Sequence, residues 1–158
     1  MRSTPLPPPT CPTSLAGVRV ADLMTPNPVS IRHGATIREA VQFLDRSGFG
    51  AAPVVNDAGR AVGVLSQFDV LLAVNAGLTG APVREVMTPS VIAVRPHTPA
   101  ADALDHMIRH MVRRVFVVDD GGVPVGVVSR TDLCRGLAAR WAAPEGRPEL
   151  SCTEEYAP

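Results

Sequence analysis

Two serine–aspartate pairs are the side chains in this sequence whose type and spacing could hold a small molecule. Ser66 precedes Asp69 by three residues, and Ser129 precedes Asp132 by the same spacing. Each serine ends a short apolar run that is typical of a strand, and each aspartate falls in the first turn of the helix expected to follow. A hydroxyl and a carboxylate at such a junction can form hydrogen bonds with a polar ligand. The pattern therefore marks two candidate binding positions.

The same spacing is also that of a capping box. In that arrangement the serine accepts a hydrogen bond from the backbone at the helix start, and the carboxylate interacts favourably with the helix dipole. Capping of this kind stabilises a protein by about 1 kcal/mol with no ligand present. For a single pair, capping and ligand binding remain open alternatives.

The pairs belong to an internal repeat whose two copies are offset by 63 residues, as Ser66 and Ser129 are. Gly-apolar-apolar-Ser-x-x-Asp is found at 63–69 and again at 126–132. A recurrence at fixed period indicates repeated structural units and outranks a local motif. Three further matched pairs keep the same offset, namely Met-Thr-Pro at 24–26 and 87–89, Ala40 and Ala103, and Val-Val at 54–55 and 117–118.

Apolar spacing and turn residues predict strand, helix, strand, strand, helix in each copy. Thr36 and Glu39 form a capping-box pattern at the first long helix, which Gly48 ends. The elements expected in the first copy are a short helix at 18–24, a strand at 29–31, a helix from 36, hairpin strands at 53–55 and 61–65, and a helix at 67–75. Those expected in the second copy are a strand at 92–94, a helix at 99–110, hairpin strands at 115–118 and 123–128, and a helix at 130–141.

We divide the chain into a disordered arm at 1–16, a first repeat at 17–78, a second repeat at 79–141 and a flexible tail at 142–158. A lone copy of about 55 residues is marginally stable on size grounds. Helices on one face of its sheet would also leave an apolar sheet surface exposed. We therefore expect an α+β fold in which two β-α-β-β-α repeats pack sheet to sheet with pseudo-twofold symmetry.

Composition limits the functional classes. The chain has 158 residues with 46% hydrophobic residues, and 15 basic residues balance 15 acidic ones. No overall charge therefore attracts nucleic acid or an anionic membrane. The first residues do not form a secretory signal, and no apolar run approaches the roughly 20 residues that span a bilayer. Cys11, Cys134 and Cys152 are scattered and are expected to be reduced, so we expect a cytoplasmic protein.

This order of elements, with Met-Thr-Pro at the start and Gly-apolar-apolar-Ser-x-x-Asp at the end of both copies, resembles the CBS domain, named for cystathionine β-synthase. The tandem pair resembles a Bateman module, and the resemblance covers residues 18–140. It implies clefts between the repeats that bind adenosine-containing ligands, namely AMP, ADP, ATP or S-adenosylmethionine. It also implies that such modules commonly form disc-shaped dimers and regulate another protein.

The resemblance implies that Asp132 accepts hydrogen bonds from both ribose hydroxyls of such a ligand. Ser129 and the helix start would contact phosphate together with Arg130 or Arg114. The base would lie against the backbone of the 115–116 strand and the strand near Ile92. The residues expected at the two sites are Ile92, Arg114, Val115, Phe116, Ser129, Arg130 and Asp132 in the second copy and Ser66 and Asp69 in the first.

The two copies are predicted to differ in their cations. The first copy has no arginine at the positions equivalent to Arg113, Arg114 and Arg130. We therefore predict that the pocket of Ser66 and Asp69 can bind ribose but is poor in phosphate contacts, so that it is occupied weakly or by an uncharged adenosyl group. The alternative for Arg113 and Arg114 is a solvated basic edge.

A metal site or a catalytic role is not expected. His106 and His110 are four residues apart on a predicted helix, but a metal site would require His97 to converge with them. The sequence has no Gly-x-Ser-x-Gly elbow, Walker-type loop or paired catalytic carboxylates, and we expect no enzyme activity, no bound metal and no obligatory cofactor. Trp141 closes the last helix, where it either covers an apolar edge in a dimer or packs on its own repeat.

Two functions remain in view. The first is a stand-alone regulatory module, expected as a homodimer, that binds an adenosyl ligand and signals in trans to a partner the sequence does not identify. The second is a ligand-independent structural or interaction dimer that keeps the fold but not the pockets.

Overall fold

The computed structural model describes residues 15–142. Most of the predicted arm and tail lies outside the described residues. The helices are α1 (Val20–Leu23), α2 (Ile37–Ser47), α3 (Gln67–Asn75), the 3-10 helix η1 (Val83–Glu85), α4 (Ala100–Arg109) and α5 (Arg130–Trp141). The strands are β1 (Thr25–Pro26), β2 (Ile31–Arg32), β3 (Ala51–Val55), β4 (Ala61–Ser66), β5 (Ala93–Val94), β6 (Arg114–Val118) and β7 (Pro124–Ser129).

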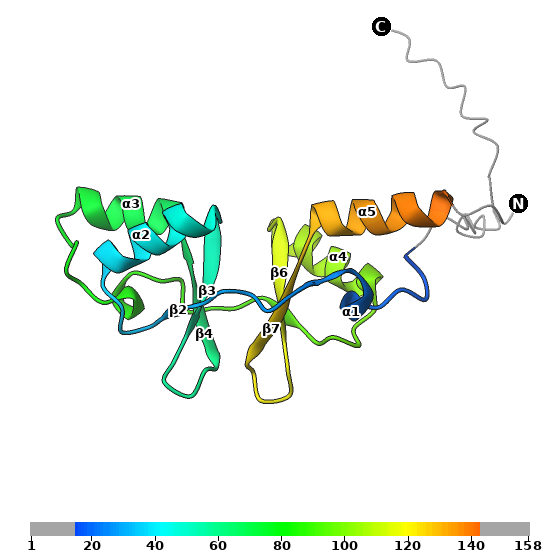
Figure 1. Cartoon of the computed structure of the whole chain (residues 1–158), viewed down its shortest axis with the longest axis horizontal. Coiled ribbons are helices and arrows are strands. Elements are labelled where there is room, and N and C mark those ends of the chain that lie inside the picture. Colours follow the sequence, from blue (N-terminus) through cyan, green and yellow to red (C-terminus); the bar gives the residue numbers. More distant parts are fainter. Residues whose placement is uncertain (1–14, 143–158) are drawn as a thin grey trace, which may run out of the picture.

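The elements form two lobes, each with its own sheet. The first lobe has the strand order β2-β3-β4, and the second has β1-β7-β6-β5. In each lobe a parallel strand pair adjoins an antiparallel hairpin. Figure 1 shows the two hairpins beside each other at the centre, with α2 and α3 on one lobe and α4 and α5 on the other. This is the predicted α+β fold of two tandem repeats.

The hairpins of the two lobes are built alike in detail. Ala51 is opposite Ser66 in the first, and Arg114 is opposite Ser129 in the second. Both ladders shift register at the same place, within the Val-Val pair of the inner strand. The 63-residue offset thus reproduces the strand pairing as well as the sequence pattern.

The lobes exchange short segments. Val20, which precedes the first copy's sheet, is fully buried in the core of the second lobe, and Val83 is fully buried in the core of the first. The segments that follow continue the exchange, because β1 pairs with β7 and Thr88 pairs with Val64. The linker at the start of each sequence copy is therefore part of the other lobe.

Local sequence accounts for the helix ends. The side chain of Thr36 accepts from the backbone N–H of Glu39, and Glu39 accepts in return from Thr36, so the predicted capping box is present. Gly48 ends α2 in the left-handed conformation, with φ of +67°. In α4 the N-cap is Pro99, which provides no side-chain cap.

Most boundaries lie within two residues of those predicted, and two of the differences change where a segment packs. The first strand begins at Ile31, because β2 pairs with β3 only at Ile31 and Arg32 and Val29 is 47% exposed. Leu15, which we had placed in the arm, is 5% exposed and packs in the core of the second lobe. Arg140 also donates to the carbonyl oxygen of Ala16 at 2.9 Å, and this hydrogen bond holds the start of the described chain against the end of α5.

Candidate functional site

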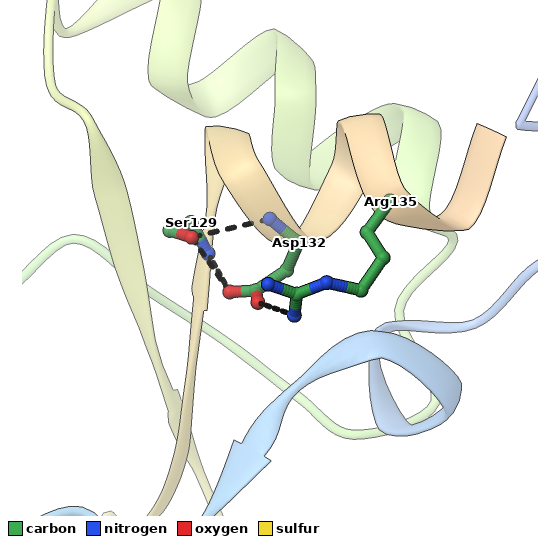
Figure 2. A network of polar contacts seen from close by, with 3 residues as sticks. All are labelled: Ser129, Asp132 and Arg135. Carbon is green, nitrogen blue, oxygen red and sulfur yellow. Dashed lines mark hydrogen bonds and ion pairs between the residues drawn. The ribbon is translucent and has the colours of Figure 1, made fainter. Parts of the chain in front are cut away.

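Both serine–aspartate pairs form capping boxes. In the first pair the backbone N–H and the hydroxyl of Ser66 donate to Oδ2 of Asp69 at 2.8 and 2.6 Å, and the N–H of Asp69 donates to the hydroxyl at 3.1 Å. The second pair repeats the arrangement at 2.8, 2.7 and 3.2 Å, with Ser129 and Asp132 (Figure 2). The capping alternative is therefore realised in both copies. Capping uses one oxygen of each carboxylate, so the chemistry of the other oxygen decides what else each pair can do.

The second oxygen distinguishes the copies. Figure 2 shows Arg135 reaching back along α5, where its Nη1 donates to Oδ1 of Asp132 at 3.3 Å. In the first copy the equivalent of Arg135 is Leu72, and Oδ1 of Asp69 has no hydrogen-bond or ion-pair partner among the described residues. A carboxylate that is bonded through one oxygen can still accept hydrogen bonds from a ligand at the other.

Asp69 opens into a cavity of about 510 Å³ that both lobes line. Such a volume lies within the range that small-molecule ligands and cofactors occupy. Residues with hydroxyl, guanidinium and aromatic side chains line it, so it can offer acceptors, donors and apolar surface. The lining residues are Gly50, Ala51, Val64, Ser66 and Asp69 from the first lobe, with Thr88 beside them, and Ser90, Ile92, Val112, Arg113, Arg114 and Phe116 from the second copy.

Asp132 opens into a second cavity, of about 370 Å³. Its wall contains the linker segment at 25–29. Arg114 and Phe116 line both cavities, so the two spaces share a wall. The lining residues are Thr25, Pro26, Asn27, Pro28, Val29, Phe49, Ala51, Pro53, Arg114, Phe116, Val127, Ser129, Thr131 and Asp132.

The predicted grouping of cations with carboxylates is therefore wrong. Arg113 and Ile92, which we assigned to the pocket of Asp132, line the cavity of Asp69 instead, and Arg114 serves both. Because each cavity is assembled from both copies, the arginines of the second copy face the carboxylate of the first. The expectation that the Asp69 pocket lacks phosphate-binding cations does not hold.

Two further residues do not lie where we expected them. Arg130 lines neither cavity but a shallow surface pocket beside α4, with Met107 and Met111. Val115 is fully buried in the core of the second lobe and is not among the lining residues of either cavity, because alternate side chains of β6 point to opposite faces. Its neighbour Phe116 reaches both cavities.

Sequence reasoning missed the contribution of the linkers. Thr25 lines the cavity of Asp132 and Thr88 lines that of Asp69. Both threonines belong to the repeated Met-Thr-Pro motif, so the repeat itself contained a signal that these positions matter. We had used that motif only as a marker of the repeat and of the family resemblance.

The histidines do not form the metal site we considered. The rings of His106 and His110 stack with centroids 6.0 Å apart. Among residues 15–142, no group of three or more histidine, cysteine or acidic side chains could hold a metal ion, so His97 does not complete a site. Within the same residues, no helix is both long and apolar enough to cross a membrane.

Two lobes of repeated α+β units, with ligand-sized cavities between them, define the class of tandem CBS-type modules. The family model of the CBS domain matches residues 20–76 and 83–139. The chain belongs to the CBS domain family, and the predicted tandem pair is confirmed.

Known proteins agree with this assignment. The CBS domain-containing protein YhcV of Bacillus subtilis is 34% identical over 116 residues, covering 72% of this chain and 81% of YhcV. A homoserine O-acetyltransferase of Methanococcoides burtonii is 31% identical over 121 residues, which are 77% of this chain but only 24% of that protein. The chain thus matches only part of this longer relative.

Solved structures of CBS pairs superpose on most of the described fold. CBSX2 in complex with AMP has a TM-score of 0.70 at 29% identity, with coverage of 78% of this chain and 98% of CBSX2. The CBS domain pair of MJ0100 in complex with 5′-methylthioadenosine and S-adenosyl-L-methionine has a TM-score of 0.68 at 25% identity, with coverage of 77% and 97%. Both of these related modules hold adenosine-containing molecules.

Proposed function

We propose that this protein is a regulatory module that binds an adenosine-containing ligand between its lobes, principally in the cavity of Asp69. The candidate ligands are AMP, ADP, ATP and S-adenosylmethionine, and they act as regulatory ligands rather than as cofactors of a reaction. The observation that carries the proposal is the 510 Å³ cavity, which is lined by Asp69, whose Oδ1 has no partner among the described residues, and by Arg113 and Arg114. The ligands of CBSX2 and MJ0100 support the adenosyl part.

The lining residues match the three parts of an adenosine nucleotide. Ile92, Val112 and Phe116 offer apolar surface to the base. Oδ1 of Asp69 can accept from the ribose hydroxyls while Oδ2 keeps the helix cap. Arg113 and Arg114 can donate charge-assisted hydrogen bonds to phosphate, and neither forms an ion pair within the described residues. The arginines favour a nucleotide over S-adenosylmethionine.

Binding at this site would couple the two lobes. A ligand there touches the first lobe through Asp69, the second through Arg114, and the exchanged linker through Thr88. It therefore stabilises one relative position of the lobes over others, which is the requirement for a ligand-driven change of conformation. We propose that this change is read in trans by a protein partner, that the module acts as a homodimer in the cytoplasm, and that neither nucleic acid nor a membrane is its partner.

One observation favours a second function, that of a ligand-independent interaction module. Both capping boxes are complete without a ligand, and Arg135 occupies the remaining oxygen of Asp132. The pair at 129–132 is thus satisfied as a purely structural element. If the pair at 66–69 is also only structural, the fold serves to present surfaces to partners.

Thermal unfolding with AMP, ATP and S-adenosylmethionine separates the two functions. A ligand that binds only the folded protein at 100 times its Kd stabilises by about 2.7 kcal/mol, which raises Tm by about 5–10 °C for a chain of this size. We expect this shift with at least one of the three ligands. No shift with any of them would favour the ligand-independent module.

Titration calorimetry with AMP then tests the site. We expect Asp69→Ala to weaken binding by about 10- to 100-fold, the loss typical of a charged hydrogen-bond acceptor. Asp132→Ala is the matched control, because it removes the same kind of cap from the equivalent helix. Equal losses from the two variants would contradict the assignment of the main site to Asp69.

A further inference from the structure

The cavities of Asp69 and Asp132 meet at three residues. Ala51, Arg114 and Phe116 line both cavities, and no other described residue does. Ala51 is the first residue of β3 and Arg114 the first residue of β6, so they hold equivalent positions in the two hairpins. Arg114 is the only charged residue of the three, and it forms no ion pair within residues 15–142. Its guanidinium is therefore placed to act on a ligand in either cavity.

The repeat provides a cation at only one of these two equivalent positions. Arg114 of the second copy corresponds to Ala51 of the first at the 63-residue offset. The second copy contributes Arg113 and Arg114 to the cavity of Asp69, whereas the first copy contributes no cation to the cavity of Asp132. Among the described residues, Arg114 is thus the only cation that lines the cavity of Asp132, and the other cavity shares it.

Charge limits how many phosphate groups the two cavities can hold. A phosphate monoester carries a charge of about −1.5 to −2 at pH 7, which matches the combined charge of Arg113 and Arg114. A guanidinium has five N–H donors and can contact two ligands, but its single positive charge cannot balance two phosphates. Once a nucleotide fills the cavity of Asp69, a phosphate entering the cavity of Asp132 therefore meets no uncompensated positive charge. A ligand with a base and a ribose but no phosphate does not have this disadvantage.

We propose that the shared guanidinium of Arg114 couples the two cavities. A nucleotide bound at Asp69 lowers the affinity of the Asp132 cavity for a second nucleotide and leaves that cavity to an uncharged nucleoside such as adenosine. The coupling is reciprocal, because linkage requires each phosphate to weaken the other by the same factor. The inference rests on the proposed function, since it takes the cavity of Asp69 as the nucleotide site. The module then senses a nucleotide and a nucleoside together rather than two molecules of one nucleotide.

Equilibrium dialysis with labelled AMP and labelled adenosine tests the coupling in the wild-type protein. With AMP at a concentration that fills the cavity of Asp69, labelled adenosine should bind one further site per chain while the AMP stays bound. A second AMP should bind that further site at least about 10-fold more weakly than adenosine does, because its phosphate loses water without gaining a free charged donor. Asp132→Ala should remove the further site, which identifies it as the second cavity.

The outcomes separate this inference from the proposed function. If AMP binds in the cavity of Asp69, and AMP and adenosine bind equally well at the further site, the coupling is wrong and the proposed function stands. If AMP binds neither cavity, the nucleotide site and the coupling are both wrong.

Asp69→Ala tests whether the occupied Arg114 is what excludes the second phosphate. This variant weakens the first cavity and leaves Arg114 available to the second. At the site that Asp132→Ala removes, AMP should then bind at least as tightly as adenosine. A preference for adenosine that persists in Asp69→Ala would show that the cavity of Asp132 itself rejects phosphate, and it would overturn the proposal.

Ala51→Arg supplies the cation that the first copy lacks. We expect it to strengthen the binding of a second AMP by about 10-fold and to leave the affinity of that site for adenosine unchanged. Ala51→Gln is the matched control, because it lengthens the same side chain without adding charge. AMP retained in the cavity of Asp69 reports that each variant is folded. A gain that is equal in the two variants, or absent from Ala51→Arg, would overturn the proposal.

Discussion

Helices α3 and α5 occupy equivalent places in the two lobes and begin with the same capping box, yet their surroundings differ. At α3 one oxygen of Asp69 is available to a cavity, whereas at α5 Arg135 holds the equivalent oxygen of Asp132. The exposed side of α3 is apolar and that of α5 is polar. The comparison teaches that a duplicated fold keeps its capping and pairing while its two copies diverge at the surfaces that meet other molecules.

The exchanged linkers allow the sharpest test of how far the copies are equivalent. A Cβ atom at Gly63 would lie 2.6 Å from Sδ of Met87 and 2.7 Å from the carbonyl oxygen of Thr88. At Gly126 it would lie 2.5 Å from Sδ of Met24, but 3.2 Å from the nearest backbone oxygen. A flexible side chain can move aside more easily than a paired backbone.

We therefore expect Gly63→Ala to lower the free energy of unfolding by about 3 kcal/mol and Gly126→Ala by about 1–2 kcal/mol, measured by denaturant titration. Gly34→Ala is the control, because no atom lies within 4 Å of its added Cβ. Equal losses at the two glycines would show that the linkers are held with the same rigidity in both lobes.

The ends of α2 and α4 differ in backbone conformation. Gly48 ends α2 at φ of +67°, but the equivalent residue in the second copy is Met111, at φ of +53° with its side chain 92% exposed. A left-handed conformation costs a residue with a side chain about 1 kcal/mol, which glycine avoids.

Met111→Gly should therefore raise the free energy of unfolding by about 0.5–1 kcal/mol, seen as a Tm increase of about 2–3 °C. The reverse change, Gly48→Met, should lower it by a similar amount. A loss of stability in Met111→Gly would mean that the exposed methionine makes a stabilising contact.

Removing the ion pair of Arg135 and Asp132 tests whether the occupied oxygen of Asp132 makes the second cavity the weaker binding site. Arg135 is 74% exposed, so the pair contributes little energy. We expect Arg135→Ala, measured in the Asp69→Ala background, to strengthen AMP binding at the second cavity by roughly threefold. Calorimetry that detects no change would indicate that the smaller volume of this cavity, not the occupied oxygen, limits binding there.

The smallest expected effect concerns acid stability. The hydrogen bonds from the backbone and side chain of Thr36 lower the pKa of Glu39 below its ordinary value of 4.5. A lowered pKa in the folded state adds stability above the unfolded pKa, and that stability is lost as the pH falls through the folded pKa.

Glu39→Gln should therefore be less stable than the wild type at pH 7, and the difference should shrink as the pH falls below the ordinary pKa of 4.5 and vanish below the lowered pKa of the folded state. Asp102→Asn is the matched control in the second copy. There the N-cap residue is Pro99, which has no backbone N–H to donate to the carboxylate of Asp102 and no side chain that accepts from the helix. Tm measured across this pH range checks both variants, and an unchanged difference at every pH would contradict the capping role of the charge.

Most of the fold was predictable because it depends on local sequence signals, and these signals occur in both copies of the repeat. The helix of Thr36 to Gly48, the two hairpins and the helix that begins at Arg130 lie within a few residues of their predicted positions. Capping boxes, left-handed glycines and alternating β-branched residues act over a few neighbours along the chain, so spacing suffices to find them.

The membership of each cavity was not predictable in this way. The serine–aspartate pairs were found from spacing, but Arg113 and Ile92 line the cavity of Asp69 rather than that of Asp132, which belongs to their own copy. Nothing in the spacing of one copy says which surface of the other copy will face it.

By itself the sequence determined that this protein is a duplicated α+β unit with a hydroxyl and a carboxylate at the start of the last helix of each copy. Tertiary structure alone decided which arginines and which linker residues accompany which carboxylate. The physical reason is that the linkers cross between the lobes and each cavity is walled by both, so its chemistry depends on contacts between segments far apart in the chain.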